Sequence, residues 1–190
     1  MVKLSNCQVL GIVGSPRRGG NTEILVDEVL LGAENAGALI KKVILNNLNI
    51  NPCQACDSCR KTGKCIHNDD MLELLEKMEQ SDIWVLGTPI YWWGPTAQFK
   101  AFLDRWYCPN HKNFKGMKVI LVIPLGGGHP NYARHTVGMF TDIFNYLDME
   151  LFETVLAPGL EERGKVREKK DILEKAYKAG QMAINKLNKS

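Results

Sequence analysis

Four of the six cysteines lie in one short polar stretch of this 190-residue chain, at Cys53, Cys56, Cys59 and Cys65. The first three are each separated by two residues, and five residues precede the fourth. Structural zinc more often uses two Cys-x-x-Cys pairs that lie further apart. The compact run favours the thiolate ligand set of a [4Fe–4S] cluster, with a zinc knuckle, a redox disulfide or unmetallated thiols as alternatives. Cys7 and Cys108 lie outside the run and are expected to be structural.

A second group of polar residues, Gly-Ser-Pro-Arg-Arg-Gly-Gly-Asn-Thr at positions 14–22, follows the first apolar run and leads into an expected helix. Free N–H groups and the dipole at a helix start favour an anion. Ser15, Asn21 and Thr22 add donors, Arg17 adds a charged donor, and Asn21 or Thr22 is the expected helix cap. The segment has neither the P-loop nor the dinucleotide pattern. It therefore predicts a site for a phosphate monoester, the alternative being a polar turn with exposed arginines.

Two further loops could meet a planar ligand. The segment 88–95, Thr-Pro-Ile-Tyr-Trp-Trp-Gly-Pro, combines aromatic rings with backbone turns, which suits contact with a flat ring. Its alternative is that Trp92 and Trp93 belong to the core or to a subunit interface. Gly126, Gly127 and Gly128 allow close approach of the backbone to a ligand, and their alternative is a flexible turn.

Apolar runs that read as strands alternate with segments of helical period. The expected strands cover 9–13, 39–45, 83–87, 118–124 and 151–156, and the expected helices begin near residues 21, 70, 96, 132 and 167. In the second helix Leu72, Leu75 and Met78 are expected on one buried face. Asp69 and Asp70 are expected to cap the start of this helix, the alternative being a metal site. This alternation indicates an α/β protein. We expect a single flavodoxin-like domain over residues 1–190, a three-layer sandwich with a parallel sheet of order 2-1-3-4-5 and a cysteine-rich loop at about 50–68. The ligand of such a fold lies at the carboxyl ends of the strands, where strand order reverses.

Composition excludes some functions. Hydrophobic residues make up 45% of the chain and charged residues 24%, as in soluble globular proteins. The net charge is +3, and the last thirty residues hold 9 basic against 5 acidic residues, so the body has no basic excess. This argues against nucleic-acid binding. Apolar runs fall short of the ~20 residues that span a bilayer, and the first residues do not resemble a signal peptide, so we expect a cytoplasmic protein that binds no membrane.

Five motifs together resemble a known family. They are Ser-Pro-Arg…Gly-Asn-Thr at 15–22, Pro-Cys…Cys…Cys…Gly-x-Cys at 52–65, Asp-Asp-Met at 69–71, Pro-Ile-Tyr-Trp-Trp-Gly at 89–94, and Lys100 with Asp104-Arg105. This combination resembles the iron–sulfur flavoproteins, which belong to the wider NADPH-dependent FMN reductase family with its flavodoxin-like fold. The resemblance covers about the first 130 residues.

The resemblance implies a role for each matched residue. The FMN phosphate would be held by Ser15, Arg17, Gly20, Asn21 and Thr22. The isoalloxazine or ribityl chain would contact Pro89, Ile90, Tyr91, Trp92, Trp93 and Gly94, and the ring site would be completed by Gly126, Gly127 and Gly128. The cluster would be ligated by Cys53, Cys56, Cys59 and Cys65. No residue is assigned as a catalytic acid or base, because the cofactors carry the chemistry.

The predicted function is therefore electron transfer between a reduced donor and an acceptor through FMN and a [4Fe–4S] cluster. The donor is ferredoxin or NAD(P)H, and the resemblance implies a homodimer or homotetramer. One alternative is a cluster-free NAD(P)H-dependent FMN or quinone reductase. Another is a non-enzymatic FMN-binding or zinc-stabilised interaction protein.

Overall fold

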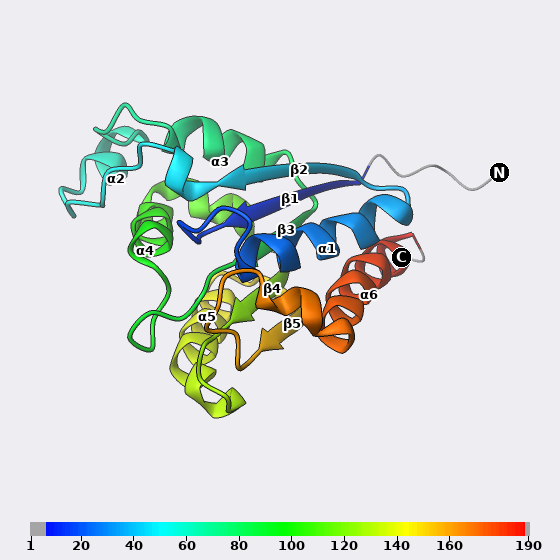
Figure 1. Cartoon of the computed structure of the whole chain (residues 1–190). Helices are drawn as coiled ribbons and strands as arrows, with labels where there is room; N and C mark the ends of the chain where they lie inside the picture. Colours follow the sequence, from blue (N-terminus) through cyan, green and yellow to red (C-terminus); the bar gives the residue numbers. More distant parts are fainter. Residues whose placement is uncertain (1–6, 189–190) are drawn as a thin grey trace.

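A parallel five-stranded sheet of order β2-β1-β3-β4-β5 forms the centre of the molecule in the computed structural model, which describes residues 7–188 apart from the side chains of residues 109–111 (Figure 1). The strands are β1 (Gln8–Val13), β2 (Leu39–Ile44), β3 (Ile83–Gly87), β4 (Lys118–Pro124) and β5 (Glu150–Ala157). The predicted fold class and strand order are confirmed. The buried runs of β-branched and aliphatic residues form central strands because both faces of the sheet are covered.

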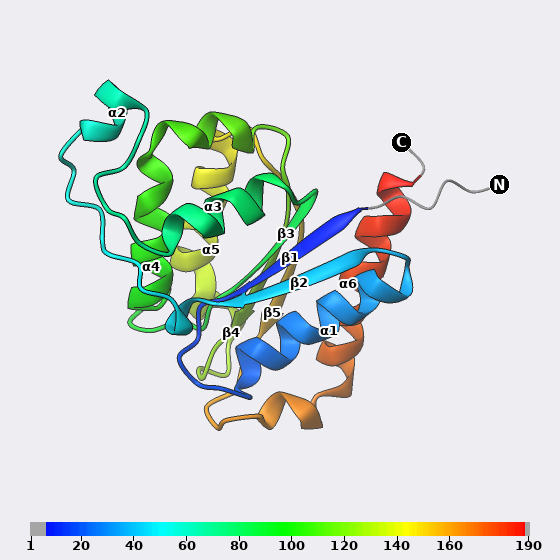
Figure 2. The same cartoon turned by 90° about the horizontal axis from the view of Figure 1, so that it is seen from above.

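Helices cover both faces of the sheet. They are α1 (Asn21–Asn35), α2 (Ser58–Thr62), α3 (Met71–Glu79), α4 (Ala97–Asp104), α5 (Arg134–Tyr146) and α6 (Lys170–Leu187), with short 3₁₀ turns η1 (Leu45–Asn47), η2 (Arg105–Tyr107), η3 (Pro109–Phe114), η4 (Pro130–Ala133) and η5 (Lys165–Glu168). Figure 2 shows α1 and α6 on one face and α3, α4 and α5 on the other. No helix in the described part of the chain is long and apolar enough to cross a membrane.

The sheet divides the core into two halves. Along β1, Val9 and Val13 pack into the cluster beneath α1 and α6, whereas Leu10 and Ile12 pack into the cluster beneath α3, α4 and α5. Alternate residues of a strand face opposite sides of a sheet, and this strand is therefore apolar on both sides. The result is the predicted three-layer arrangement.

Backbone pairing continues past the strand ends and fixes where the loops begin. The Gly14 N–H donates to the Gly87 carbonyl at 2.7 Å, and the Thr88 N–H donates to the Val122 carbonyl at 3.0 Å. These bonds extend the parallel ladders by one residue at the carboxyl edge. The loops that follow β1, β3 and β4 therefore leave the sheet side by side, next to the point between β1 and β3 where the strand order reverses.

Three local predictions were wrong. Leu72 of α3 is 41% exposed, and Met71 and Leu74 are buried with Leu75 and Met78, so the buried face is displaced from the one expected. The cysteine-rich stretch expected as a loop at about 50–68 is not all loop, since α2 lies within it. The cap residue of α1 is Gly20, so neither Asn21 nor Thr22 caps this helix.

Candidate functional site

The loop between β1 and α1 wraps tightly around the start of the helix. The Gly20 N–H donates to the Arg17 carbonyl at 3.1 Å, and the Arg17 N–H donates to the Ser15 hydroxyl at 3.2 Å. A Cβ atom on Gly20 would lie 2.8 Å from the Arg17 carbonyl oxygen, so the turn needs glycine at this position. The first amides of α1 have no acceptor within the helix, which leaves them available to an anion in front of the loop.

Glu23, which was not predicted as a site residue, anchors this loop through a hydrogen bond to its backbone. Its carboxylate is nearly buried and accepts hydrogen bonds from the Gly19 N–H at 2.7 Å and from Lys42 at 3.2 Å, with Arg18 at 3.3 Å. Burial by itself raises the pKa of the Glu23 carboxyl, but the bonds from Gly19 and Lys42 outweigh it, and the pKa is lowered overall. Glu23 is therefore an ionised structural group. Its charge is balanced by Lys42. Arg17 lines the cavity on the other side of the loop.

The Asn21 side chain ties the helix start to a distant loop. Its Nδ2 donates to the Leu160 carbonyl at 3.2 Å and to the Glu162 carbonyl at 2.7 Å, and its Oδ1 accepts the Val166 N–H at 3.0 Å. In this arrangement the amide is used to fasten the segment 160–166. Asn21 lines the predicted phosphate site, but its polar atoms hold the wall of that site.

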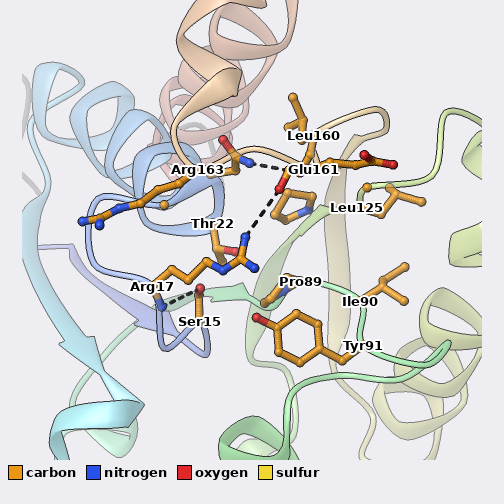
Figure 3. Close-up of a pocket in the computed structure, with 14 residues that line it drawn as sticks. Ser15, Arg17, Thr22, Pro89, Ile90, Tyr91, Leu125, Leu160, Glu161 and Arg163 are labelled. Atoms are coloured by element: carbon orange, nitrogen blue, oxygen red, sulfur yellow. Dashed lines mark hydrogen bonds between the residues drawn. The ribbon is translucent and has the colours of Figure 1, made fainter.

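These elements enclose a polar cavity of about 250 Å³ at the carboxyl edge of the sheet. Most of the predicted phosphate and ring residues line it, namely Ser15, Arg17, Gly20, Asn21, Thr22, Pro89, Ile90, Tyr91 and Gly126. Figure 3 shows Ser15, Arg17 and Thr22 on one side of the hollow and Pro89, Ile90 and Tyr91 on the other, with the Arg163 side chain extending away from it. Arg163 also lines the cavity and was not predicted from the sequence, and Arg17 Nη1 donates to the Glu161 carbonyl at 3.4 Å.

An aromatic turn at 91–94 stands beside this cavity. Tyr91 and Gly94 exchange two backbone hydrogen bonds of 2.9 and 3.1 Å, and Trp92 and Trp93 between them have φ values of 50° and 62°. Positive φ at both central residues is the geometry of a type I′ turn, which usually selects Asn-Gly. Trp92 is 91% exposed and Trp93 49% exposed, so neither indole belongs to the core of this chain. The Thr136 hydroxyl donates to the Trp93 carbonyl at 2.8 Å and ties the turn to α5.

The two tryptophans and the glycine loop form a second cavity of about 320 Å³, lined by Ile90, Trp92, Trp93, Leu125, Gly126, Gly127 and Tyr132. It shares Ile90 and Gly126 with the polar cavity, so the two hollows are adjacent. The Gly127 backbone lies close to the Tyr132 ring, since a Cβ atom at this position would be 2.5 Å from it. Gly94 and Gly128 lie outside the linings of both cavities. The pair of cavities has one end with charged lining residues, Arg17, Glu161 and Arg163, and one aromatic end.

The cysteine-rich segment follows β2 and lies at the periphery, near α3 and α4 (Figures 1 and 2). Cys53 and Cys56 are exposed, and Cys59 and Cys65 are half-buried. Within the described residues, no three Cys, His, Asp or Glu side chains lie close enough together to hold a metal ion. Cys7 and Cys108 are buried, as expected for structural thiols.

The donor set and the backbone of this segment nevertheless suit a thiolate-bound metal centre. Four sulfur ligands within 13 residues are the ligand chemistry of iron–sulfur clusters and of soft metals. Each stretch between successive cysteines contains one residue with a left-handed backbone: Ala55, Asp57 and Gly63, with φ values of 50°, 56° and 75°. The chain therefore turns back on itself between one thiol and the next. A shift of the side chains and of the exposed part of the loop is still needed to bring the four sulfurs together.

Both ends of this segment are fastened to Arg105, the first residue of η2. Its Nη1 donates to the Asn51 carbonyl at 2.9 Å and to the Asp69 carboxylate at 2.6 Å, and its Nη2 donates to the Cys65 sulfur at 3.3 Å. Asp69 was expected to cap α3; its second oxygen does accept the Met71 N–H at 3.3 Å, but its main partner is Arg105. Asp70 occupies the cap position, and its carboxylate accepts the Asn49 N–H instead.

A doubly wound sheet of order 2-1-3-4-5 with a polar cavity at its switch point defines a protein of the flavodoxin-like class. The model of the NADPH-dependent FMN reductase family matches residues 7–157, and the chain belongs to this family.

The chain resembles several iron–sulfur flavoproteins of this family. One from Archaeoglobus fulgidus is 39% identical over 105 residues, which are 55% of this chain and 48% of that protein. One from Methanosarcina thermophila is 34% identical over 136 residues, 71% of each chain. The matched region thus spans about half the length of the first relative. The resemblance inferred from the motifs is confirmed.

A solved structure of a flavone reductase has the same fold. Its TM-score is 0.76 at 20% sequence identity, over 96% of this chain and 63% of the other. At this identity the likeness concerns the fold alone.

Proposed function

We propose that this chain is an FMN-dependent oxidoreductase that also carries a [4Fe–4S] cluster and passes electrons between a reduced donor and an acceptor. The observation that carries the FMN part is the pair of adjacent cavities at the switch point, one polar and one aromatic. FMN has the matching shape, with a phosphate at one end and a planar ring system at the other. Membership of the FMN reductase family supports this assignment.

The polar cavity is the proposed phosphate site. Arg17 supplies positive charge, the start of α1 supplies backbone N–H groups, and the Ser15 hydroxyl supplies a further polar group. Asn21 keeps the 160–166 wall in place. The aromatic cavity is the proposed ring site, where Trp93 and Tyr132 exclude water and the backbone at Gly126 and Gly127 approaches closely.

Cys53, Cys56, Cys59 and Cys65 are the proposed cluster ligands. A bound cluster would exchange single electrons with the flavin, which can take two, so that a two-electron and a one-electron partner could be linked. The protein holds and orients both groups, and no side chain is assigned a proton-transfer role. The electron donor is proposed to be ferredoxin or NAD(P)H, and the working form a cytoplasmic homodimer or homotetramer.

The first test is the visible absorption spectrum of protein purified without oxygen, with FMN, iron, sulfide and zinc assayed on the same sample. The proposal expects flavin bands on a broad shoulder near about 400 nm and about four irons per chain. Flavin without iron, after a failed reconstitution with iron and sulfide, would reject the cluster and keep the flavin. Zinc in place of iron would assign the cysteines to a structural site.

A pair of variants separates the two cofactors. Cys56→Ser is expected to lose the cluster and retain FMN at wild-type stoichiometry, because Cys56 is exposed and lines neither cavity. Cys7→Ser, the same chemical change at a buried cysteine outside the segment, is expected to retain both. Loss of FMN together with iron in Cys56→Ser would show that the two sites are not independent.

A cluster-free NAD(P)H-dependent FMN or quinone reductase is the second candidate. It is favoured by one observation: the four thiols are not gathered around a common point in the described conformation. This candidate expects NAD(P)H to bleach the bound flavin in protein that contains no iron, and expects Cys56→Ser to keep the full rate of that reaction. The first candidate expects the variant to lose electron transfer to a one-electron acceptor.

A further inference from the structure

Arg105 and its ion-pair partner Asp69 are both buried. The Arg105 side chain is 3% exposed, and that of Asp69 is 1% exposed. Removing a guanidinium from water is costly unless its charge is balanced and its N–H groups are bonded. Asp69 balances the charge, at 2.6 Å from Nη1. Replacement of such a pair by apolar residues is often neutral or stabilising in other proteins, so the pair points to a role beyond stability.

The contacts of Arg105 define that role. Asn51 lies two residues before Cys53, and Asp69 lies four residues after Cys65, so one guanidinium binds both ends of the cysteine-rich segment. The other terminal nitrogen, Nη2, lies 3.3 Å from the Cys65 sulfur. The two nitrogens therefore have different partners. Nη1 joins the two ends of the cysteine-rich segment, and Nη2 donates to the sulfur of a proposed cluster ligand.

The ionisation of Asp69 keeps this arrangement intact. Burial by itself raises the pKa of the Asp69 carboxyl, but hydrogen bonds from Arg105 and Asn51 outweigh it and lower the pKa to about 2. Asp69 is therefore charged at any physiological pH. Arginine does not lose its proton in proteins, and Nη2 consequently remains a hydrogen-bond donor whatever the state of the sulfur.

We propose that Arg105 is the positioning residue of the cysteine-rich segment and holds Cys65 in place before the cluster binds. Through its N–H···S bond, Arg105 would also make the bound cluster easier to reduce. The proposal rests on the cluster of the proposed function. Each reduction adds one electron, and therefore one negative charge, to the cluster; no atom is transferred and Arg105 keeps its proton. A buried cation bonded to a ligand sulfur stabilises that added charge, since hydrogen bonds to the sulfurs set cluster potentials.

Arg60 provides a matched comparison. It belongs to α2, follows Cys59, and stacks over the Tyr107 ring at 4.7 Å from the centroid while donating to the Tyr107 hydroxyl. Its side chain is 59% exposed, so solvent screens its charge. Arg60→Gln and Arg105→Gln remove the same charge from the same region of the molecule. Only Arg105→Gln also removes buried bonds, those to the Asn51 carbonyl, the Asp69 carboxylate and the Cys65 sulfur.

The experiment measures FMN, iron and sulfide per chain, and the cluster potential, in wild type, Arg105→Gln, Arg105→Lys and Arg60→Gln after anaerobic reconstitution. The expectation for Arg105→Gln is wild-type FMN content, faster loss of iron to a chelator, and at least a tenfold lower ratio of reduced to oxidised cluster at a fixed potential. That tenfold change equals about 59 mV for one electron. Arg105→Lys keeps the charge but lacks the planar fork, and is expected to restore the potential in part.

Different failures have different meanings. A wild-type chain that takes up no iron and sulfide refutes the proposed cluster, and this role with it. A wild-type chain that binds the cluster, combined with an unchanged potential and chelation rate in Arg105→Gln, refutes the positioning role alone. An equal shift in Arg60→Gln would also overturn it, because the effect would then be one of net charge. If Arg105→Gln does not fold, as judged by circular dichroism, the same comparison of potential and chelation rate in Arg105→Lys decides.

Discussion

Substituting Asn21 by alanine is expected to loosen one wall of the flavin site and to destabilise the whole domain. The change removes three hydrogen bonds, two donated to the Leu160 and Glu162 carbonyls and one accepted from the Val166 N–H. At a net 0.5–1.5 kcal/mol each, the loss amounts to about 3 kcal/mol. For a chain of this length the melting temperature should fall by about 6–12 °C.

The assay is urea unfolding of the FMN-free protein, followed by FMN titration of the folded variant. Asn35→Ala is the matched control: it lies in the same helix but loses a single exposed bond, at 3.1 Å, to the Tyr177 hydroxyl. We expect about 1 kcal/mol or less for this control. FMN affinity should fall in Asn21→Ala because Leu160 and Arg163 line the polar cavity and depend on the fastened loop.

Two results would refute this reasoning. If Asn21→Ala were as stable as Asn35→Ala, the three bonds would not hold the loop. If its stability were unchanged while FMN affinity fell, Asn21 would act as a direct phosphate ligand, as the sequence alone suggests, and not through the loop.

Three further outcomes follow from the packing. Gly180→Ala should cost about 3 kcal/mol in urea unfolding, because the new Cβ would lie 1.9 Å from the Val29 carbonyl oxygen where α6 crosses α1; a near-neutral effect would contradict this close contact. Thr96→Val should cost about 2 kcal/mol, since the hydroxyl caps α4 at 3.2 Å from the Phe99 nitrogen and donates to the Gly14 carbonyl at 2.5 Å. Asp69 has a pKa of about 2 in the folded chain against an ordinary 3.8, so its stabilising contribution, about 2 kcal/mol, is complete above about pH 4 and lost as the pH falls to about 2. Wild type and Asp69→Asn, both free of FMN and metal, should therefore differ less in free energy of unfolding as the pH falls over that range. A difference that does not depend on pH would argue against the ion pair.

The sequence was sufficient to predict the sheet because its signals are local. Buried strands such as 118–124 are continuous apolar runs, and the parallel order follows from their alternation with helices. Loops that follow neighbouring strands meet at one edge, which is why most of the predicted phosphate and ring residues line a common cavity. Strand topology, and not side-chain detail, carried that prediction.

What the sequence did not predict depends on contacts between distant segments. Asn21 meets carbonyls and an N–H that lie 139 to 145 residues away, and Arg105 meets partners 36 to 54 residues away. The local pattern around each looks ordinary: an asparagine near a helix start reads as a cap, and an arginine after a helix reads as a solvated charge. The family motif that includes Arg105 gave a hint of its position but not of its partners.

The turn at Trp92 and Trp93 shows how the fold accepts a local cost at this site. Non-glycine residues in left-handed conformation cost about 1–2 kcal/mol each, and exposing an indole gains no burial in return. The turn persists because both sides are fixed: the Thr88 hydroxyl accepts the Thr96 N–H at 3.2 Å, and Thr136 holds the Trp93 carbonyl. A strained turn that places an indole 91% in solvent beside a cavity does not serve the stability of this chain. We propose that it serves a contact with a ligand or a partner, and this is why the proposed function assigns the aromatic cavity to the flavin ring.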